Sequence, residues 1–139
     1  MTATPAPGVW PSLRFRDAAA ALGWLVDTIG FTEHAVYRGD AVGDPERDVA
    51  HAELLWPGGG GIMLGSDTGS GWAGSAGGPG TATTYLSADD PRPVFERVDA
   101  AGWTIIRPLT EQSYGGSEFA FLDPEGNAWS VGSYRGENL

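Results

Sequence analysis

The stretch "EFAFLDPEGNAWSVGS" (residues 118–133) has the pattern of an apolar strand, a tight turn and a second apolar strand. Moved back by 67 positions, so that residue 118 falls on residue 51, it aligns with "HAELLWPGGGGIMLGS" (51–66). Both segments contain an apolar run, a Pro-x-Gly turn and another apolar run that ends in Gly-Ser. The alignment predicts a structural unit that occurs twice in the chain.

A predicted helix precedes each hairpin. Asp17 lies thirteen residues before Gly30, and Asp89 lies thirteen before Gly102. Asp17 or Asp90 can accept hydrogen bonds from the first turn, and each glycine suits the left-handed position after the last turn. Apolar residues three or four apart predict one buried stripe on each helix: Ala18, Leu22, Leu25 and Ile29 on the first, and Pro91, Val94, Val98 and Ala101 on the second.

Strand-like runs with alternating polarity flank each helix, so each unit is predicted as strand, helix, strand, strand, strand. We place module one at residues 9–66, module two at 81–134, and a Gly/Ser-rich linker at 67–80. A helix covers one face of each sheet, and the second module is expected to help close the other face. The sequence therefore predicts a single α+β domain, residues 1–139, made of two tandem βαβββ modules.

Composition excludes several classes of function. The 139 residues include no Cys and no Lys, which excludes disulfides, thiolate chemistry and lysine Schiff bases. Eighteen acidic residues against eight arginines give a net charge of −10, which repels nucleic acids and anionic lipids. This charge either attracts cationic small molecules or only keeps the protein in solution. Short apolar runs and the N-terminal "MTATPAPG" predict neither a membrane span nor an export signal, so we expect a cytoplasmic protein.

The tandem βαβββ pattern, with "DPEGN" before the last strand, resembles the vicinal oxygen chelate superfamily of glyoxalases, extradiol dioxygenases and bleomycin-resistance proteins. The resemblance runs from about Val9 to Tyr134 and includes "LRFRD" and "LGWLVDTIGF" in the order expected. It implies a cup-shaped, mixed-sheet half-barrel and a homodimer. The fold hosts many activities, so it does not by itself assign a function.

In metal-dependent members of this superfamily, His, Gln or Glu ligands lie on the first and last strands of each module. The corresponding positions here are Trp10, Met63, Thr83 and Ser130, with Leu64 in place of Met63 if the register slips by one. An indole does not bind metal, a thioether is a soft ligand, and hydroxyls alone are poor ligands. We therefore predict no metal, no cofactor and a hairpin that has lost its ligand.

A ligand-binding cleft with aromatic walls is predicted on the sheet faces opposite the helices. Strand alternation sends Ala52, Leu54, Phe119, Phe121, Trp129 and Val131 toward the helices. The opposite faces then carry aromatic and polar side chains suited to a planar or amphipathic small molecule. The predicted binding residues of the strands are Trp10, Arg14, His51, Glu53, Thr83, Tyr85, Glu118 and Ser130.

Two loop aromatics complete the predicted site, and several roles stay open. Trp72, in the linker, is either a lid over the ligand or a plug at an interface, and the hydroxyl of Tyr114 contacts either the ligand or a backbone carbonyl. Glu53 is either a ligand contact or a cross-strand partner of Arg14. His51 is either a general base or a hydrogen-bonded strand histidine.

The preferred function is metal-independent binding of an aromatic or cationic compound, such as an antibiotic, by a homodimer without catalytic residues. The first alternative is a lyase, isomerase or dioxygenase-like enzyme that acts on a small carbonyl or aromatic substrate. The second is a module whose cavity serves only folding or partner binding. The sequence does not identify the ligand.

Overall fold

The computed structural model describes residues 5–39, 44–69, 78–111 and 116–139. It contains two βαβββ modules, as predicted, each with a four-stranded mixed sheet. Module one consists of β1 (Ser12–Phe15), α1 (Ala18–Trp24), the π-helical turn η1 (Leu25–Ile29), β2 (Thr32–Arg38), β3 (Val49–Leu55) and β4 (Gly61–Ser66). Module two consists of β5 (Thr83–Ser87), α2 (Arg92–Ala100), β6 (Ile105–Glu111), β7 (Ser117–Leu122) and β8 (Ala128–Gly132).

The two sheets have equivalent topologies. Sheet A has the strand order β1-β4-β3-β2 and sheet B the order β5-β8-β7-β6. In each, the first strand of the module pairs in parallel with the last, and the other pairs are antiparallel. Arg14 lies opposite Gly65 and Ser87 lies opposite Gly132, so the duplication predicted from the hairpins extends to the first strands.

The repeated Gly-Ser at the end of each hairpin has a structural reason. The Ser66 hydroxyl accepts a hydrogen bond from the N–H of Val49 at 2.8 Å, and the Ser133 hydroxyl accepts one from the N–H of Ser117 at 3.0 Å. Each serine hydroxyl therefore accepts from a backbone N–H at the start of the preceding strand and ties the two strand ends together.

The helices begin and end close to the predicted residues. Asp17 Oδ1 accepts from the N–H of Ala20 at 3.1 Å, and Gly30 and Gly102 have left-handed φ values of 114° and 76°. One difference is the π-helical turn η1, in which the N–H groups of Gly30 and Phe31 both point to the carbonyl of Leu25. The other is Ala101, predicted on the buried stripe of α2 but exposed, because the helix has already ended there.

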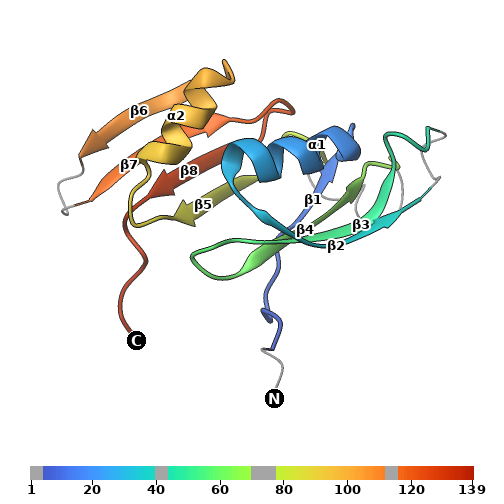
Figure 1. The fold of residues 1–139 in the computed structure, drawn as a ribbon, viewed down its shortest axis with the longest axis horizontal. Helices are drawn as coiled ribbons and strands as arrows, with labels where there is room; N and C mark the ends of the chain where they lie inside the picture. The colour runs from blue at the N-terminus through green and yellow to red at the C-terminus, as the bar shows by residue number, and fades with distance from the viewer. Residues whose placement is uncertain (1–4, 40–43, 70–77, 112–115) are drawn as a thin grey trace.

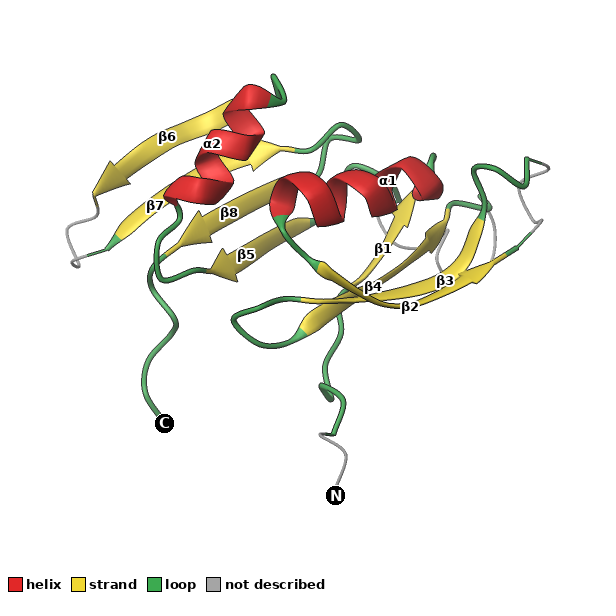
Figure 2. Cartoon of the chain, viewed as in Figure 1, coloured by secondary structure: helices red, strands yellow, loops and turns green. Residues whose placement is uncertain are grey.

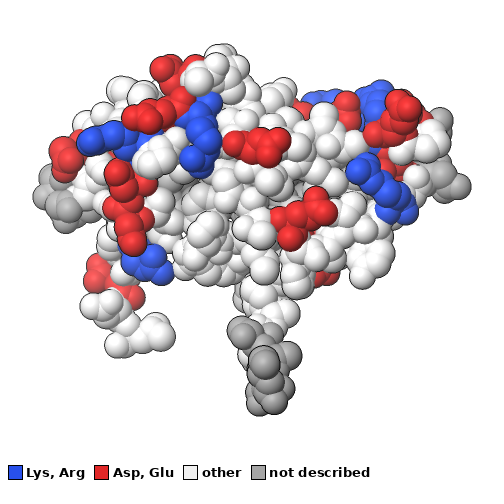
Figure 3. Space-filling view, viewed as in Figure 1, with Lys and Arg blue, Asp and Glu red and all other residues white. Residues whose placement is uncertain are grey.

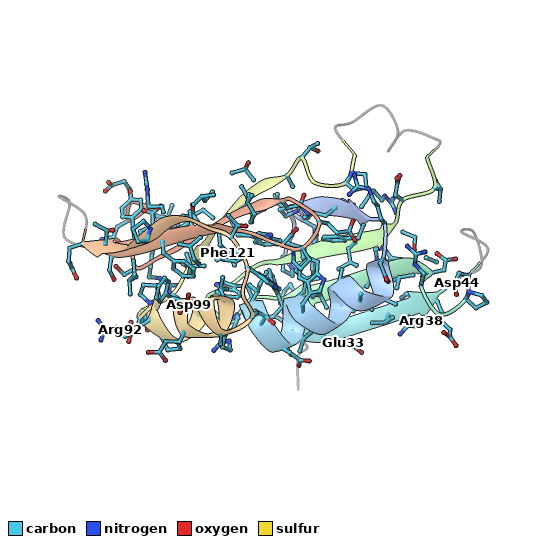
Figure 4. The ribbon with its side chains drawn as sticks, turned by 90° about the horizontal axis from the view of Figure 1, so that it is seen from above. Glu33, Arg38, Asp44, Arg92, Asp99 and Phe121 are labelled. Atoms are coloured by element: carbon cyan, nitrogen blue, oxygen red, sulfur yellow. The ribbon has the colours of Figure 1, made fainter. Side chains whose placement is uncertain are left out.

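A single hydrophobic core extends through both modules. All six residues predicted to face the helices, Ala52, Leu54, Phe119, Phe121, Trp129 and Val131, are buried in it. Edge-to-face aromatic pairs join the modules: Trp24 with Trp103 at 5.4 Å, and Phe31 with Trp129 at 5.9 Å between ring centroids. Figure 4 shows Phe121 between the strands and α2, with Arg92, Glu33, Arg38 and Asp44 toward the outside of the molecule.

The helices lie along one side of the molecule, and η1 contacts α2. Strands β1 and β5, each at the edge of its own sheet, lie near the centre of the molecule (Figures 1 and 2). The two sheets are not closed into a barrel, which gives the open half-barrel expected from the sequence. In the described residues, no helix is both long and apolar enough to cross a membrane.

Candidate functional site

The four positions that the resemblance compares with metal ligands hold side chains that are poor ligands for divalent metals. The Trp10 indole lies over Gly61 and donates to the carbonyl of Pro7 at 2.6 Å, whereas Met63 lies opposite Ser12. Thr83 is exposed opposite Ala128, and Ser130 is half-buried opposite Tyr85 on the neighbouring strand. Among the described residues, no three His, Cys, Asp or Glu side chains are arranged to hold a metal ion.

On sheet A, a polar cluster lies on the face opposite the core. His51 Nε2 is 2.9 Å from Glu53 Oε2, and the ring of Tyr37 stacks on the His51 imidazole with centroids 6.2 Å apart. The guanidinium of Arg14 lies over Gly65, where a side chain would collide with it. Because His51 and Glu53 are only partly buried, both remain accessible to a ligand.

On sheet B, a second polar cluster forms around Gly132. An added Cβ at Gly132 would lie 2.7 Å from the Tyr85 hydroxyl oxygen and 3.2 Å from Glu118 Cγ, so these two side chains lie over the glycine. The Tyr85 hydroxyl donates to the carbonyl of Tyr134 at 2.6 Å. Glu118 Oε1 is 3.4 Å from Arg107 Nη1, and the Glu118 side chain is only 13% exposed.

The surroundings of Tyr85 make its phenol harder to ionise. Burial raises the pKa of the Tyr85 hydroxyl above its ordinary value, and the negative charge of Glu118 raises this pKa further. The hydrogen bond to the Tyr134 carbonyl acts in the opposite direction but is smaller. The neutral Tyr85 hydroxyl, which donates to the Tyr134 carbonyl, thus lies beside a carboxylate that can accept a hydrogen bond or attract a cation.

The structure brings together only some of the predicted site residues. His51 contacts Glu53, and Tyr85 lies beside Glu118 and opposite Ser130. Trp72 and Tyr114 lie outside the described residues. Tyr37 and Arg107 were missed, because both come from the outer strands β2 and β6, whose registers contain irregularities that the sequence does not reveal.

The family model of the Glyoxalase/Bleomycin resistance protein/Dioxygenase superfamily matches residues 9–131, most of the chain. The chain belongs to this superfamily. The resemblance inferred from the tandem hairpins is therefore confirmed. No curated protein sequence matches the chain.

Solved structures agree with this assignment. TioX from Micromonospora sp. ML1 is 30% identical, with a TM-score of 0.69 over 90% of this chain and 98% of its own. A glyoxylase/bleomycin resistance protein/dioxygenase domain from Frankia sp. EAN1pec is 23% identical, with a TM-score of 0.65 over 96% of each chain. TnmS3, an antibiotic binding protein from Streptomyces sp. CB03234, is 21% identical, with a TM-score of 0.63 over 94% of this chain and 96% of its own.

Proposed function

We propose that this protein binds a small planar compound, aromatic or cationic and of the antibiotic type, without transforming it. The observation that carries the proposal is the pair of polar clusters on the faces opposite the core, His51 with Glu53 and Tyr85 with Glu118. Partly buried carboxylates favour a cationic group, and tyrosine rings offer flat surfaces for an aromatic body. The positions compared with metal ligands hold poor ligands for divalent metals, which favours binding over metal-dependent chemistry. These positions are Trp10, Met63, Thr83 and Ser130.

The similarity to TnmS3 supports this proposal at the level of the fold. That protein is described as antibiotic binding, and its structure shares the architecture of this chain at 21% identity. The same half-barrel with altered side chains can accommodate a different ligand, since function depends on the residues of the site. The open faces would form the binding surface, and the strongly negative chain would attract a cation.

A titration with planar cationic drugs and the cationic glycopeptide bleomycin tests the proposal. We expect saturable binding with shifts in the NMR signals of Tyr85 and His51. Glu118→Gln should weaken the binding of a cationic compound about tenfold, because the ligand loses a charge-assisted hydrogen bond. Asp99→Asn, on the exposed surface of α2, has the same charge change and should leave affinity unchanged. Equal weakening by both variants would point to net charge alone.

We also propose that two chains pair, so that the open faces of one chain are completed by the other. Tyr37 and Ile106 are 62% and 53% exposed on the outer strands β2 and β6, which leaves apolar surface available to a second copy. Light scattering of the purified protein tests this pairing. A mass of one chain at all concentrations, together with full ligand binding, would contradict it.

A second candidate function rests on the 2.9 Å contact between His51 and Glu53. A carboxylate that orients an imidazole is the arrangement of a general base, which would suit a lyase or isomerase acting on a small carbonyl or aromatic substrate. Product analysis with such substrates tests this function. Turnover that is lost in His51→Ala but kept in Arg38→Gln would favour the enzyme over the binding protein.

A further inference from the structure

A cavity of about 280 Å³ lies at the junction of the two modules, apart from the polar clusters of the open faces. Its module-one wall includes Ile29, Trp56 and Gly58, and the opposite wall includes Val94 and Arg97 of module two and Arg135 of the C-terminal segment. None of the residues of the polar clusters on the open faces lines it. Two of the eight arginines of a strongly acidic chain therefore meet in one cavity.

Arg97 is held in place by module one. Its Nε donates to the carbonyl of Thr28 at 2.8 Å, and its Nη2 donates to the carbonyl of Ile29 at 3.1 Å. Gly30 makes room for this contact, because a Cβ there would lie 2.9 Å from Arg97 Nη2. A guanidinium has five N–H groups, so three remain after these two bonds to the end of η1. The arginine is thus ordered before any ligand arrives.

Arg135 approaches the cavity from the C-terminal segment. Its Nη2 donates to the carbonyl of Gly58 at 3.1 Å, in the turn between β3 and β4. Its Nη1 is 3.9 Å from Asp89 Oδ1, a loose ion pair whose carboxylate is 97% exposed. Such an exposed ion pair contributes little binding energy, so an anion in the cavity can compete with Asp89 for the Arg135 guanidinium.

Apart from Ser87 and the exposed carboxylate of Asp89, most of the remaining wall is apolar. Ile29 and Val94 are buried, and Trp56 is 9% exposed. The indole N–H of Trp56 already donates to the carbonyl of Ser87 at 2.7 Å, so this residue offers the cavity carbon atoms and no free donor. A cavity with two guanidinium groups, one of them held in place, and a mostly apolar wall suits a molecule with an anionic head and an apolar body.

We propose that this junction cavity binds a small carboxylate with an aromatic or branched apolar body. The carboxylate pairs with the remaining N–H groups of Arg97 and Arg135, and the body packs on Trp56, Pro57 and Val94. This charge preference is opposite to that of the open sheet faces. Because the ligand touches both modules, its binding stabilises their junction and raises the melting temperature of the chain.

The experiment is an NMR titration of the full chain with 2-naphthoate, with 2-naphthylmethanol as the neutral analogue and inorganic phosphate as the anion without an apolar body. We expect 2-naphthoate to shift the Trp56 indole N–H and Arg97 Nε–H signals and to bind more tightly than both analogues. Equal binding of the naphthoate and the alcohol overturns the proposal. Equal binding of phosphate, or saturation without a shift at Trp56, also overturns it.

Variants of exposed residues test the charge requirement without disturbing the core. Arg135→Gln should weaken 2-naphthoate about tenfold, which corresponds to one charge-assisted hydrogen bond. Asp89→Asn should strengthen it roughly two- to fivefold, because the competing carboxylate is removed. Arg92→Gln, on α2 but outside the cavity wall, is the matched control and should leave affinity unchanged. Equal effects of Arg92→Gln and Arg135→Gln would show that only net charge matters and contradict the site.

Discussion

The two modules use the same turn between their last two strands in different ways. Trp56 in module one and Asp123 in module two occupy equivalent positions, 67 residues apart. Asp123 organises its own turn: its carboxylate accepts from the backbone N–H groups of Glu125 and Asn127 and from the side chains of Asn127 and Trp129. Trp56 instead reaches across to the carbonyl of Ser87 in the other module. Equal folds therefore do not imply equal stabilising contacts.

Each turn nevertheless contacts the other module in the region between its first strand and its helix. The Glu125 carboxylate of module two accepts from the backbone N–H groups of Arg16 and Asp17 at 2.6 and 2.9 Å, where α1 begins. The Trp56 turn of module one contacts the end of β5, before α2 begins. The hydrogen bonds from the Glu125 carboxylate are charge-assisted, whereas the hydrogen bond from the Trp56 indole is neutral. The two contacts between the modules should therefore differ in strength.

The open faces of the modules differ more than their backbones do. His51 and Glu118 occupy equivalent positions, again 67 residues apart, but His51 pairs with Glu53 whereas Glu118 pairs with Arg107. In Figure 3, acidic and basic side chains lie interspersed on the visible face, without a large area of one sign. The duplication preserved the backbone of the unit, while the chemistry of each copy diverged.

The largest expected effect is that of Asp123→Ala. The change removes a carboxylate that is 4% exposed and leaves several buried donors, including the Trp129 indole N–H, without an acceptor. We expect a loss of about 3 kcal/mol or more in the free energy of unfolding. Trp56→Phe, at the equivalent position, should cost about 1–2 kcal/mol for one hydrogen bond and some packing. Urea unfolding measures both, and equal losses would contradict the contrast between the turns.

Glu125→Ala should have a smaller effect on stability. It removes the acceptor of two backbone N–H groups at the start of α1, for which we expect a loss of about 1–2 kcal/mol. Amide hydrogen exchange should show faster exchange at Arg16 and Asp17, with little change at the start of α2. Glu125→Gln keeps one acceptor oxygen, so its stability and its exchange rates at Arg16 and Asp17 should lie between those of the unchanged protein and those of Glu125→Ala. Unchanged amide exchange at Asp17 in Glu125→Ala would show that the Glu125 carboxylate does not stabilise the start of α1.

The smallest change concerns the titration of Tyr85 in module two. Glu118→Gln should lower the pKa of Tyr85 but leave it above the ordinary value, because burial is the larger cause of its elevation. A raised pKa in the folded chain means that the neutral phenol stabilises the fold up to about pH 10 and that this contribution is lost at higher pH.

NMR of tyrosine Cζ resonances resolves the individual hydroxyls. The pKa of Tyr134 is raised by its hydrogen bond to Glu137 and should not change in Glu118→Gln, which makes it an internal control. An unchanged Tyr85 titration in the variant would mean that the carboxylate of Glu118 does not act on this hydroxyl.

Local patterns in the sequence determined the duplicated unit, the limits of the helices and the buried face of each strand. An aspartate before a helix, a glycine after it and the alternation of apolar residues act over a few positions, so they can be found without knowing what lies nearby in space. Phe119, Phe121 and Trp129 were accordingly placed on the correct face.

Only the tertiary structure decided which side chains meet. Tyr37 reaches His51 and Arg107 reaches Glu118 across irregular strand pairs, and Glu125 reaches Arg16 from 109 residues away. The junction cavity likewise combines Arg97, Arg135 and Trp56 from segments that share no motif. Such contacts depend on strand register and on the packing of one module against the other, and no short-range pattern encodes these.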